Sequence, residues 1–130
     1  MIVELCFARR GSYGILYCLG NGVEEIEEKI NSKEKVECVN LDYSGKDTKL
    51  YGLIDGKSNN RLGENLKLIL SVLPYEDTVI DNEIVKKGYM ELKTEIDNFK
   101  GKPYYDFLSE LLDLMKSCIE RNCGLVAIGD

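Results

Sequence analysis

Apolar and polar residues follow a helical pattern between residues 103 and 120. The apolar residues fall within an arc of about 160° on a helical wheel, and polar residues fill the other side. Pro103 suits the first helical position, and Gly124 suits a left-handed residue just past the helix end. Residues 125–128 form an unbroken apolar run, which is typical of a strand covered on both faces. The apolar side of the helix consists of Phe107, Leu108, Leu111, Leu112, Leu114, Met115, Cys118 and Ile119.

The same periodicities predict elements in the rest of the chain. Three further helices are predicted over 23–30, 62–73 and 81–99. Asn21 lies where it can cap the first of these helices. Four further strands are predicted over 2–8, 13–19, 36–43 and 50–54, although Gly52 weakens the last. A polar turn at residues 9–12 joins the first two strands into a hairpin.

This order of elements predicts an α+β fold in a single domain spanning residues 1–130. A hairpin cannot be parallel, so the sheet must be mixed or antiparallel. We expect a mixed sheet of four to five strands, with an N-terminal hairpin and a C-terminal strand, packed by about four helices. The last strand is expected beside the first, because both are apolar on two sides.

The net charge and the composition disfavour several classes of function and location. The formal net charge is −6, which disfavours nucleic-acid binding because phosphate needs a basic face. Glu4 lies where a secretory signal would carry basic residues, and no apolar stretch approaches the roughly 20 residues of a membrane span. The five cysteines are odd in number and scattered, which favours reduced, buried thiols. A cytoplasmic protein with no membrane partner is expected.

Few residues of the sequence indicate a catalytic, metal-binding or cofactor-binding site. The chain has no histidine, which removes the commonest general base and metal ligand, and no C-x-x-C pair, so no metal site is predicted. Gly20-Asn21-Gly22 resembles the start of a dinucleotide-binding loop, but Glu25 occupies the place of its third glycine. We predict no catalytic residue and no cofactor. The alternative is a small ligand-binding domain or enzyme that uses cysteine, tyrosine, lysine or carboxylate groups.

Carboxylates at helical spacing are the most informative polar feature. Asp106, Glu110 and Asp113 are predicted on the solvent side of the C-terminal helix, and Glu24 and Glu28 repeat the spacing. Each like-charged pair costs about 0.2–0.5 kcal/mol, so the pattern is either a solvated face or a surface for a cationic partner. Tyrosines beside acidic residues suit such an interface. The candidate partner-binding residues are Asp106, Glu110, Asp113, Glu24, Glu28, Tyr104, Tyr105, Glu76 and Asp77.

The C-terminal pattern of an apolar-striped helix followed by N-C-G-L-V-A-I-G resembles immunity proteins of bacterial polymorphic and contact-dependent toxin systems. The resemblance covers about a quarter of the chain and carries over no functional residue. It implies a small inhibitor that neutralises a cognate basic toxin, such as a nuclease, by occluding it. A phage-encoded inhibitor that mimics nucleic-acid charge would differ mainly in its target. Whether the protein is a monomer or a small oligomer stays open.

Overall fold

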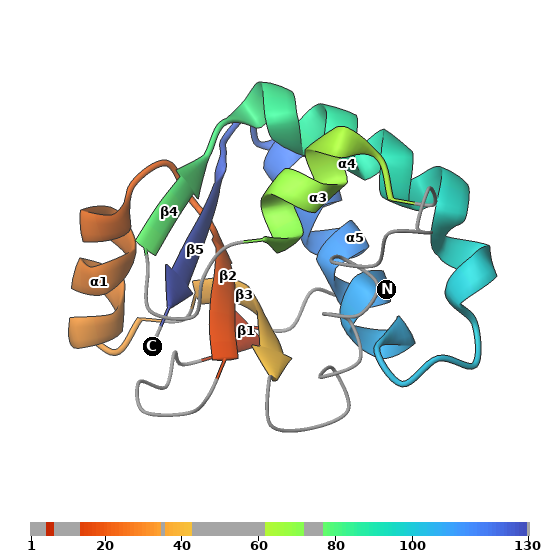
Figure 1. The fold of residues 1–130 in the computed structure, drawn as a ribbon. Helices are drawn as coiled ribbons and strands as arrows, with labels where there is room; N and C mark the ends of the chain where they lie inside the picture. The colour runs from red at the N-terminus through yellow and green to blue at the C-terminus, as the bar shows by residue number, and fades with distance from the viewer. Residues whose placement is uncertain (1–4, 7–13, 35, 43–61, 72–76, 130) are drawn as a thin grey trace.

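Five strands form one sheet in the order β1-β3-β2-β5-β4 (Figure 1). The computed structural model describes residues 5–6, 14–34, 36–42, 62–71 and 77–129. Every strand pairing within these ranges is antiparallel, so the sheet is not mixed. The strands are β1 (Leu5–Cys6), β2 (Gly14–Leu19), β3 (Val36–Asp42), β4 (Asp77–Ile80) and β5 (Leu125–Gly129).

Helices cover both faces of this sheet (Figure 1). On one face lies α1 (Val23–Asn31), and on the other lie α3 (Glu64–Leu70), α4 (Asn82–Glu95) and α5 (Tyr105–Glu120). A short 3-10 helix, η2 (Ile96–Phe99), follows α4 directly. The predicted α+β class is therefore confirmed. Because α5 begins at Tyr105, Pro103 precedes the helix and does not occupy its first position.

Two predicted strand pairings are wrong. β3 lies between β1 and β2, so these strands form no hairpin, and β5 pairs with β2 and β4 and not with β1. β3 can occupy an interior position because it is apolar on both faces: Val36 and Cys38 point to one face, and Val39 and Leu41 to the other. Pairing between consecutive strands is only a preference, which burial overrides here.

Strand β4 was not predicted, although Thr78-Val79-Ile80 is a run of β-branched residues. Its four residues are too short to show a periodicity. The predicted strand over 50–54, the turn at 9–12 and the last residues of the predicted helix over 62–73 lie outside the described residues.

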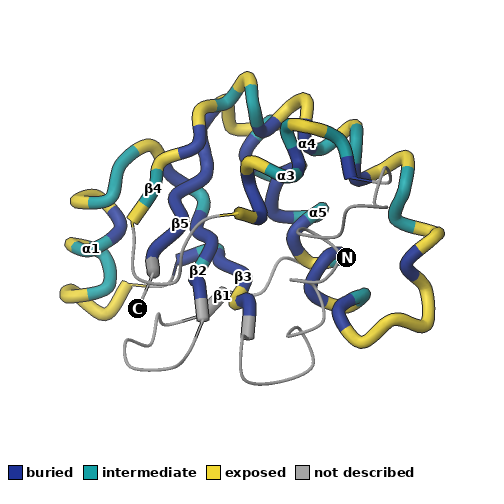
Figure 2. The backbone as a smooth tube through the Cα atoms, viewed as in Figure 1, coloured by how far each residue is buried: buried dark blue, intermediate teal, exposed yellow. Residues whose placement is uncertain are grey.

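The sheet divides the buried side chains into two cores. Figure 2 colours the backbone of residues 125–128 as buried. Successive residues of β2 and β5 point to opposite faces, as the pleat requires. Ile15, Tyr17 and Ala127 join the larger core under α3, α4 and α5. Cys18 and Val126 join the smaller core, where α1 contributes Ile26. Residues 125–128 are buried on both faces, as predicted from their unbroken apolar run.

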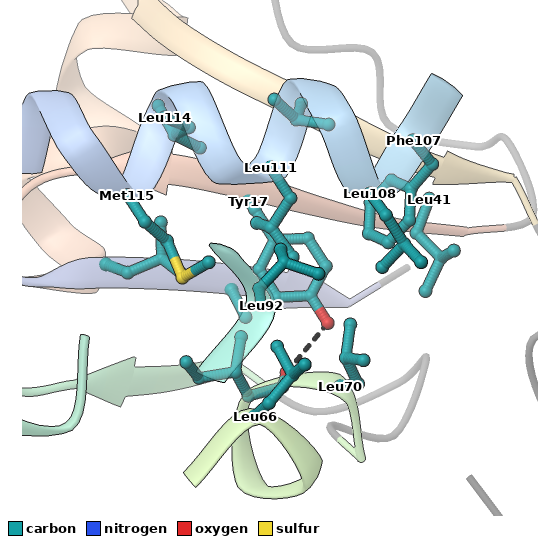
Figure 3. Packing of buried hydrophobic residues seen from close by; sticks show 14 of the residues in the cluster. Tyr17, Leu41, Leu66, Leu70, Leu92, Phe107, Leu108, Leu111, Leu114 and Met115 are labelled. Atoms are coloured by element: carbon teal, nitrogen blue, oxygen red, sulfur yellow. Dashed lines mark hydrogen bonds between the residues drawn. The ribbon is translucent and has the colours of Figure 1, made fainter. Parts of the chain in front are cut away.

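Tyr17 links the sheet to α3 within the larger core (Figure 3). Its ring is fully buried, and its hydroxyl donates a hydrogen bond of 2.8 Å to the main-chain oxygen of Ile69. The ring also lies 6.0 Å from that of Phe107 in α5. One side chain of β2 therefore contacts two of the covering helices.

Helices α3 and α4 approach closely at Gly88. A Cβ atom at this position would lie 2.5 Å from the Cδ1 atom of Ile69. Next to this contact, Glu91 of α4 accepts hydrogen bonds from the Leu66 main-chain nitrogen at 2.9 Å and from the Asn65 amide at 2.8 Å. Glu91 thus satisfies a free donor in the first turn of α3, and its charge suits the positive end of that helix.

The end of α5 is a Schellman motif. The main-chain nitrogen of Cys123 donates to the oxygen of Cys118 at 2.9 Å, and that of Asn122 donates to Ile119 at 3.2 Å. Asn122 is the left-handed residue, with a φ of 53°. The prediction that Gly124 has this role is wrong, because asparagine also tolerates the left-handed region.

Gly124 is required for a different reason. A Cβ atom there would lie 2.5 Å from the main-chain oxygen of Ile80, so the space between β4 and β5 admits only hydrogen. The Gly124 nitrogen donates to the side-chain oxygen of Asn21 at 2.8 Å, and its oxygen accepts from the Gly20 nitrogen at 3.1 Å. Asn21 therefore holds the start of β5 and does not cap α1, whose N-cap is Gly22.

We expect Gly124→Ala to lower the free energy of unfolding by about 2–3 kcal/mol, because the new methyl group meets main-chain atoms. The control is Gly22→Ala, where nothing lies within 4 Å of the new Cβ. There only the poorer N-cap counts, and the loss should stay below about 1 kcal/mol. Urea unfolding of both variants measures the difference, and equal losses would contradict the steric explanation.

Tyr17→Phe should cost about 1–2 kcal/mol of unfolding free energy, because it leaves the buried Ile69 oxygen without this donor. Tyr89→Phe is the matched control on α4, where the tyrosine is only partly buried. That change should stay within about 0.5 kcal/mol. Thermal unfolding by circular dichroism compares the two, and a loss at Tyr17 no larger than that at Tyr89 would contradict the assignment.

Candidate functional site

The predicted carboxylates lie on opposite faces of the sheet. Glu24 and Glu28 belong to α1, whereas Asp106, Glu110 and Asp113 belong to α5. Because α1 packs on the smaller core and α5 on the larger one, the sheet separates the two groups (Figure 1). The predicted set therefore cannot form one continuous interface.

The outward side of α1 is acidic. Glu24, Glu25 and Glu28 are exposed, while Ile26 is fully buried against the sheet. Lys29 pairs with Glu25 at 3.5 Å. Within the described part of the chain, Glu24 and Glu28 form no ion pair and no side-chain hydrogen bond. These two carboxylates, four residues apart on one helix, repel each other, and no cation of the described residues pairs with either.

The edge strand β4 borders this acidic helix. Asp77 and Val79 are register partners of Ile128 and Val126, which belong to the core under α1, so both point to the α1 side of the sheet. Asp77 is exposed, and Val79 is 47% exposed. We call Glu24, Glu28, Asp77 and Val79 the α1–β4 surface. It combines negative charge with one large apolar side chain.

The α5 carboxylates differ from the prediction in one case. Asp106 and Glu110 are exposed, and both already interact with other groups of the chain. Asp113 is half-buried, and its Oδ2 atom is shielded from solvent without a hydrogen-bond partner among the described residues. Asp113 is therefore not part of a solvent-facing stripe. On the wheel Asp113 lies opposite the middle of the apolar arc, so the helical pattern alone does not account for its half-burial.

The two predicted interface tyrosines face the core. Tyr104 is 6% exposed, and its ring lies edge-on to Phe99 with 6.0 Å between the centroids. Tyr105 is partly buried and packs against the same core. The prediction that Tyr104 is open to a partner is thus wrong, because the chain before α5 turns this ring inward. Glu76 lies outside the described residues.

A polar cluster that was not predicted lies at the end of α5. Arg121 approaches Glu37 of β3 with 2.7 Å between Nη1 and Oε2 and 3.4 Å between Nη2 and Oε1. The shorter contact is an ion pair without hydrogen-bond geometry. The Glu37 side chain is only 17% exposed, so it depends on Arg121 for compensation. Cys118 and Cys123 lie beside this pair.

Burial raises the pKa of the three free thiols among the described residues. Burial raises the pKa of Cys18 to about 12. Burial, and next the adjacent Cys123, raises the pKa of Cys118 far above the usual thiol range. Burial also raises the pKa of Cys123, against the opposing effects of a hydrogen bond from Cys118 and the charge of Arg121. These three cysteines are free, but Cys38 is disulfide-bonded, which corrects the expectation of five reduced thiols.

The described residues contain neither a group of metal ligands nor a membrane-spanning helix. In the ranges that the structure describes, no three histidine, cysteine or acidic residues gather in a way that could hold a metal ion. No helix of those ranges combines the length and apolar character needed to cross a bilayer. The chain matches no family model, no curated protein and no solved structure.

We expect Arg121→Met to destabilise the protein by about 1–2 kcal/mol, because the shielded Glu37 carboxylate would lose its cationic partner. Lys100→Met is the control, since Lys100 and Asp97 form an exposed ion pair whose side chains are 65% and 81% exposed. Such pairs contribute about 0–1 kcal/mol. Denaturant unfolding at pH 7 measures the loss of unfolding free energy in both variants. Equal losses would show that Glu37 does not depend on Arg121.

Proposed function

We propose that this chain is a small acidic protein-binding domain, and that it acts as an immunity protein. In this proposal it neutralises a cognate basic toxin, such as a nuclease, by occluding it. The proposal rests on the α1–β4 surface and on the resemblance of the C-terminal segment to immunity proteins. It concerns a protein partner and not a nucleic acid, because the chain carries a net charge of −6.

The observation that carries the proposal is the charge of Glu24 and Glu28, which form no ion pair with any residue that the structure describes. Elsewhere in the described chain, lysines pair with nearby carboxylates, as Lys86 does with Glu83 and Lys100 with Asp97. Two like charges left facing solvent cost stability, and a basic partner would turn that cost into attraction. Their field would also speed the encounter with such a partner.

The arrangement of the surface agrees with a binding role. Protein interfaces place apolar side chains at the centre and charged groups at the rim. Val79 supplies an exposed apolar group on β4, and the carboxylates of α1 lie on the same side of the sheet. The α5 side supports the proposal less, because Asp106 and Glu110 have interactions of their own.

The site of action is part of the same proposal. We infer a cytoplasmic protein, and the free thiols of Cys18, Cys118 and Cys123 support a reducing compartment. The disulfide at Cys38 is an observation against it. The alternative function is an enzyme or ligand-binding domain that uses cysteine, tyrosine, lysine or carboxylate groups. Of these groups, burial holds the thiols of Cys18 and Cys118 in the protonated form, which disfavours them as nucleophiles.

The test uses the protein encoded next to this chain in its genome as the candidate toxin. We expect it to bind the full chain, and growth arrest by that protein should be relieved when both are expressed. The combined variant Glu24→Gln with Glu28→Gln should lower the association rate constant about tenfold at low salt and flatten its dependence on ionic strength. Surface plasmon resonance at several salt concentrations measures both quantities.

The matched control is Glu83→Gln with Asp97→Asn, which removes the same charge from exposed positions of α4 and η2. Its association rate constant should change less than threefold, because α4 and η2 pack on the opposite face of the sheet from α1. Equal effects of the two variants would contradict the interface. Lack of binding and of growth relief would contradict the immunity function itself.

A further inference from the structure

The Schellman motif at the end of α5 brings two thiols together. In this motif the third residue from the helix end and the second residue beyond its cap commonly make an apolar contact. Here these positions are Cys118 and Cys123, joined by the main-chain hydrogen bond of 2.9 Å. Both side chains belong to the larger core, and each thiol shifts the pKa of the other. The two positions that make the apolar contact of the motif are therefore both cysteines.

The two thiols are not equivalent. Cys118 is fully buried, whereas Cys123 is 7% exposed and lies next to the guanidinium of Arg121. The positive charge of Arg121 and the hydrogen bond from Cys118 both lower the pKa of Cys123 relative to burial alone. Cys123 is thus the sulfur that an external reagent reaches first, and the one better able to lose its proton.

We propose that Cys118 and Cys123 form a modification site for small-molecule disulfides, in which Cys123 attacks the reagent and Cys118 completes an intramolecular disulfide. This site lies at the α5–β5 junction, and the inference does not depend on the proposed immunity function. Cys18 takes no part, because it points into the core on the opposite face of the sheet.

The reaction balances as two exchanges. The Cys123 thiolate, after losing its proton to water, attacks one sulfur of a disulfide R–S–S–R, forming Cys123–S–S–R and releasing RS⁻. The Cys118 sulfur, on losing its proton, then attacks the Cys123 sulfur and releases the second RS⁻. The protein loses two hydrogen atoms, and the small-molecule disulfide is reduced to two thiols. The existing Schellman contact holds the two sulfurs together for the second step.

The test incubates the folded wild-type protein with glutathione disulfide at pH 8 and then quenches it in acid. Trypsin cleaves after Lys116 and Arg121, so Cys118 and Cys123 fall in separate peptides. We expect mass spectrometry of the unreduced digest to find peptides 117–121 and 122–130 linked to each other. The intact mass should fall by two hydrogens, without a lasting glutathione adduct.

Two variants identify the role of each sulfur. Cys118→Ala should stop at the mixed disulfide, so that a glutathione adduct on Cys123 becomes the end product. Cys123→Ala should leave Cys118 without any adduct, because Cys118 is fully buried. The digest of the wild-type protein tests the proposed disulfide even if a variant fails to fold. A lasting adduct on wild-type Cys123, linkage to another cysteine, or no reaction would each overturn the proposal.

Discussion

The burial of β5 between two strands and under two layers of helices is the constraint on which the structure depends. Its residues 125–128 are covered on both faces, with β2 on one edge and β4 on the other. A strand in this position must enter the sheet within a narrow space, and Gly124 leaves room for the main-chain oxygen of Ile80. Three parts of the chain that are far apart in the sequence meet at this entry: the end of β2, the end of β4 and the turn from α5 into β5.

The same constraint separates the chemistry of the molecule into two places. The sheet keeps the acidic side of α1 apart from α5, so one charged surface is available to a partner on the α1 side. On the α5 side, the turn from α5 into β5 places Cys118 against Cys123, next to the ion pair of Arg121 with Glu37. Binding and thiol exchange, as proposed, would thus use different parts of the chain.

Much of the fold followed from local patterns in the sequence. The apolar arc between residues 103 and 120 and the run at 125–128 predicted α5 and β5, and the spacing over 81–99 predicted α4 with η2. Less of the candidate site could be predicted. Glu24 and Glu28 are exposed as expected, but Tyr104 is buried and Asp113 is half-buried. A helical wheel shows angular position only, and it does not show which distant segments of the chain cover each side of the helix.

The sequence by itself determined which segments are helices and which are two-sided strands, because those properties depend on spacing within a few turns or residues. Only the tertiary structure decided the strand order, with β3 between β1 and β2, since pairing depends on how all faces are buried together. It also decided why position 124 requires glycine, and that Arg121 pairs with Glu37, 84 positions away. Such contacts arise when distant segments share one core, and no local pattern encodes them.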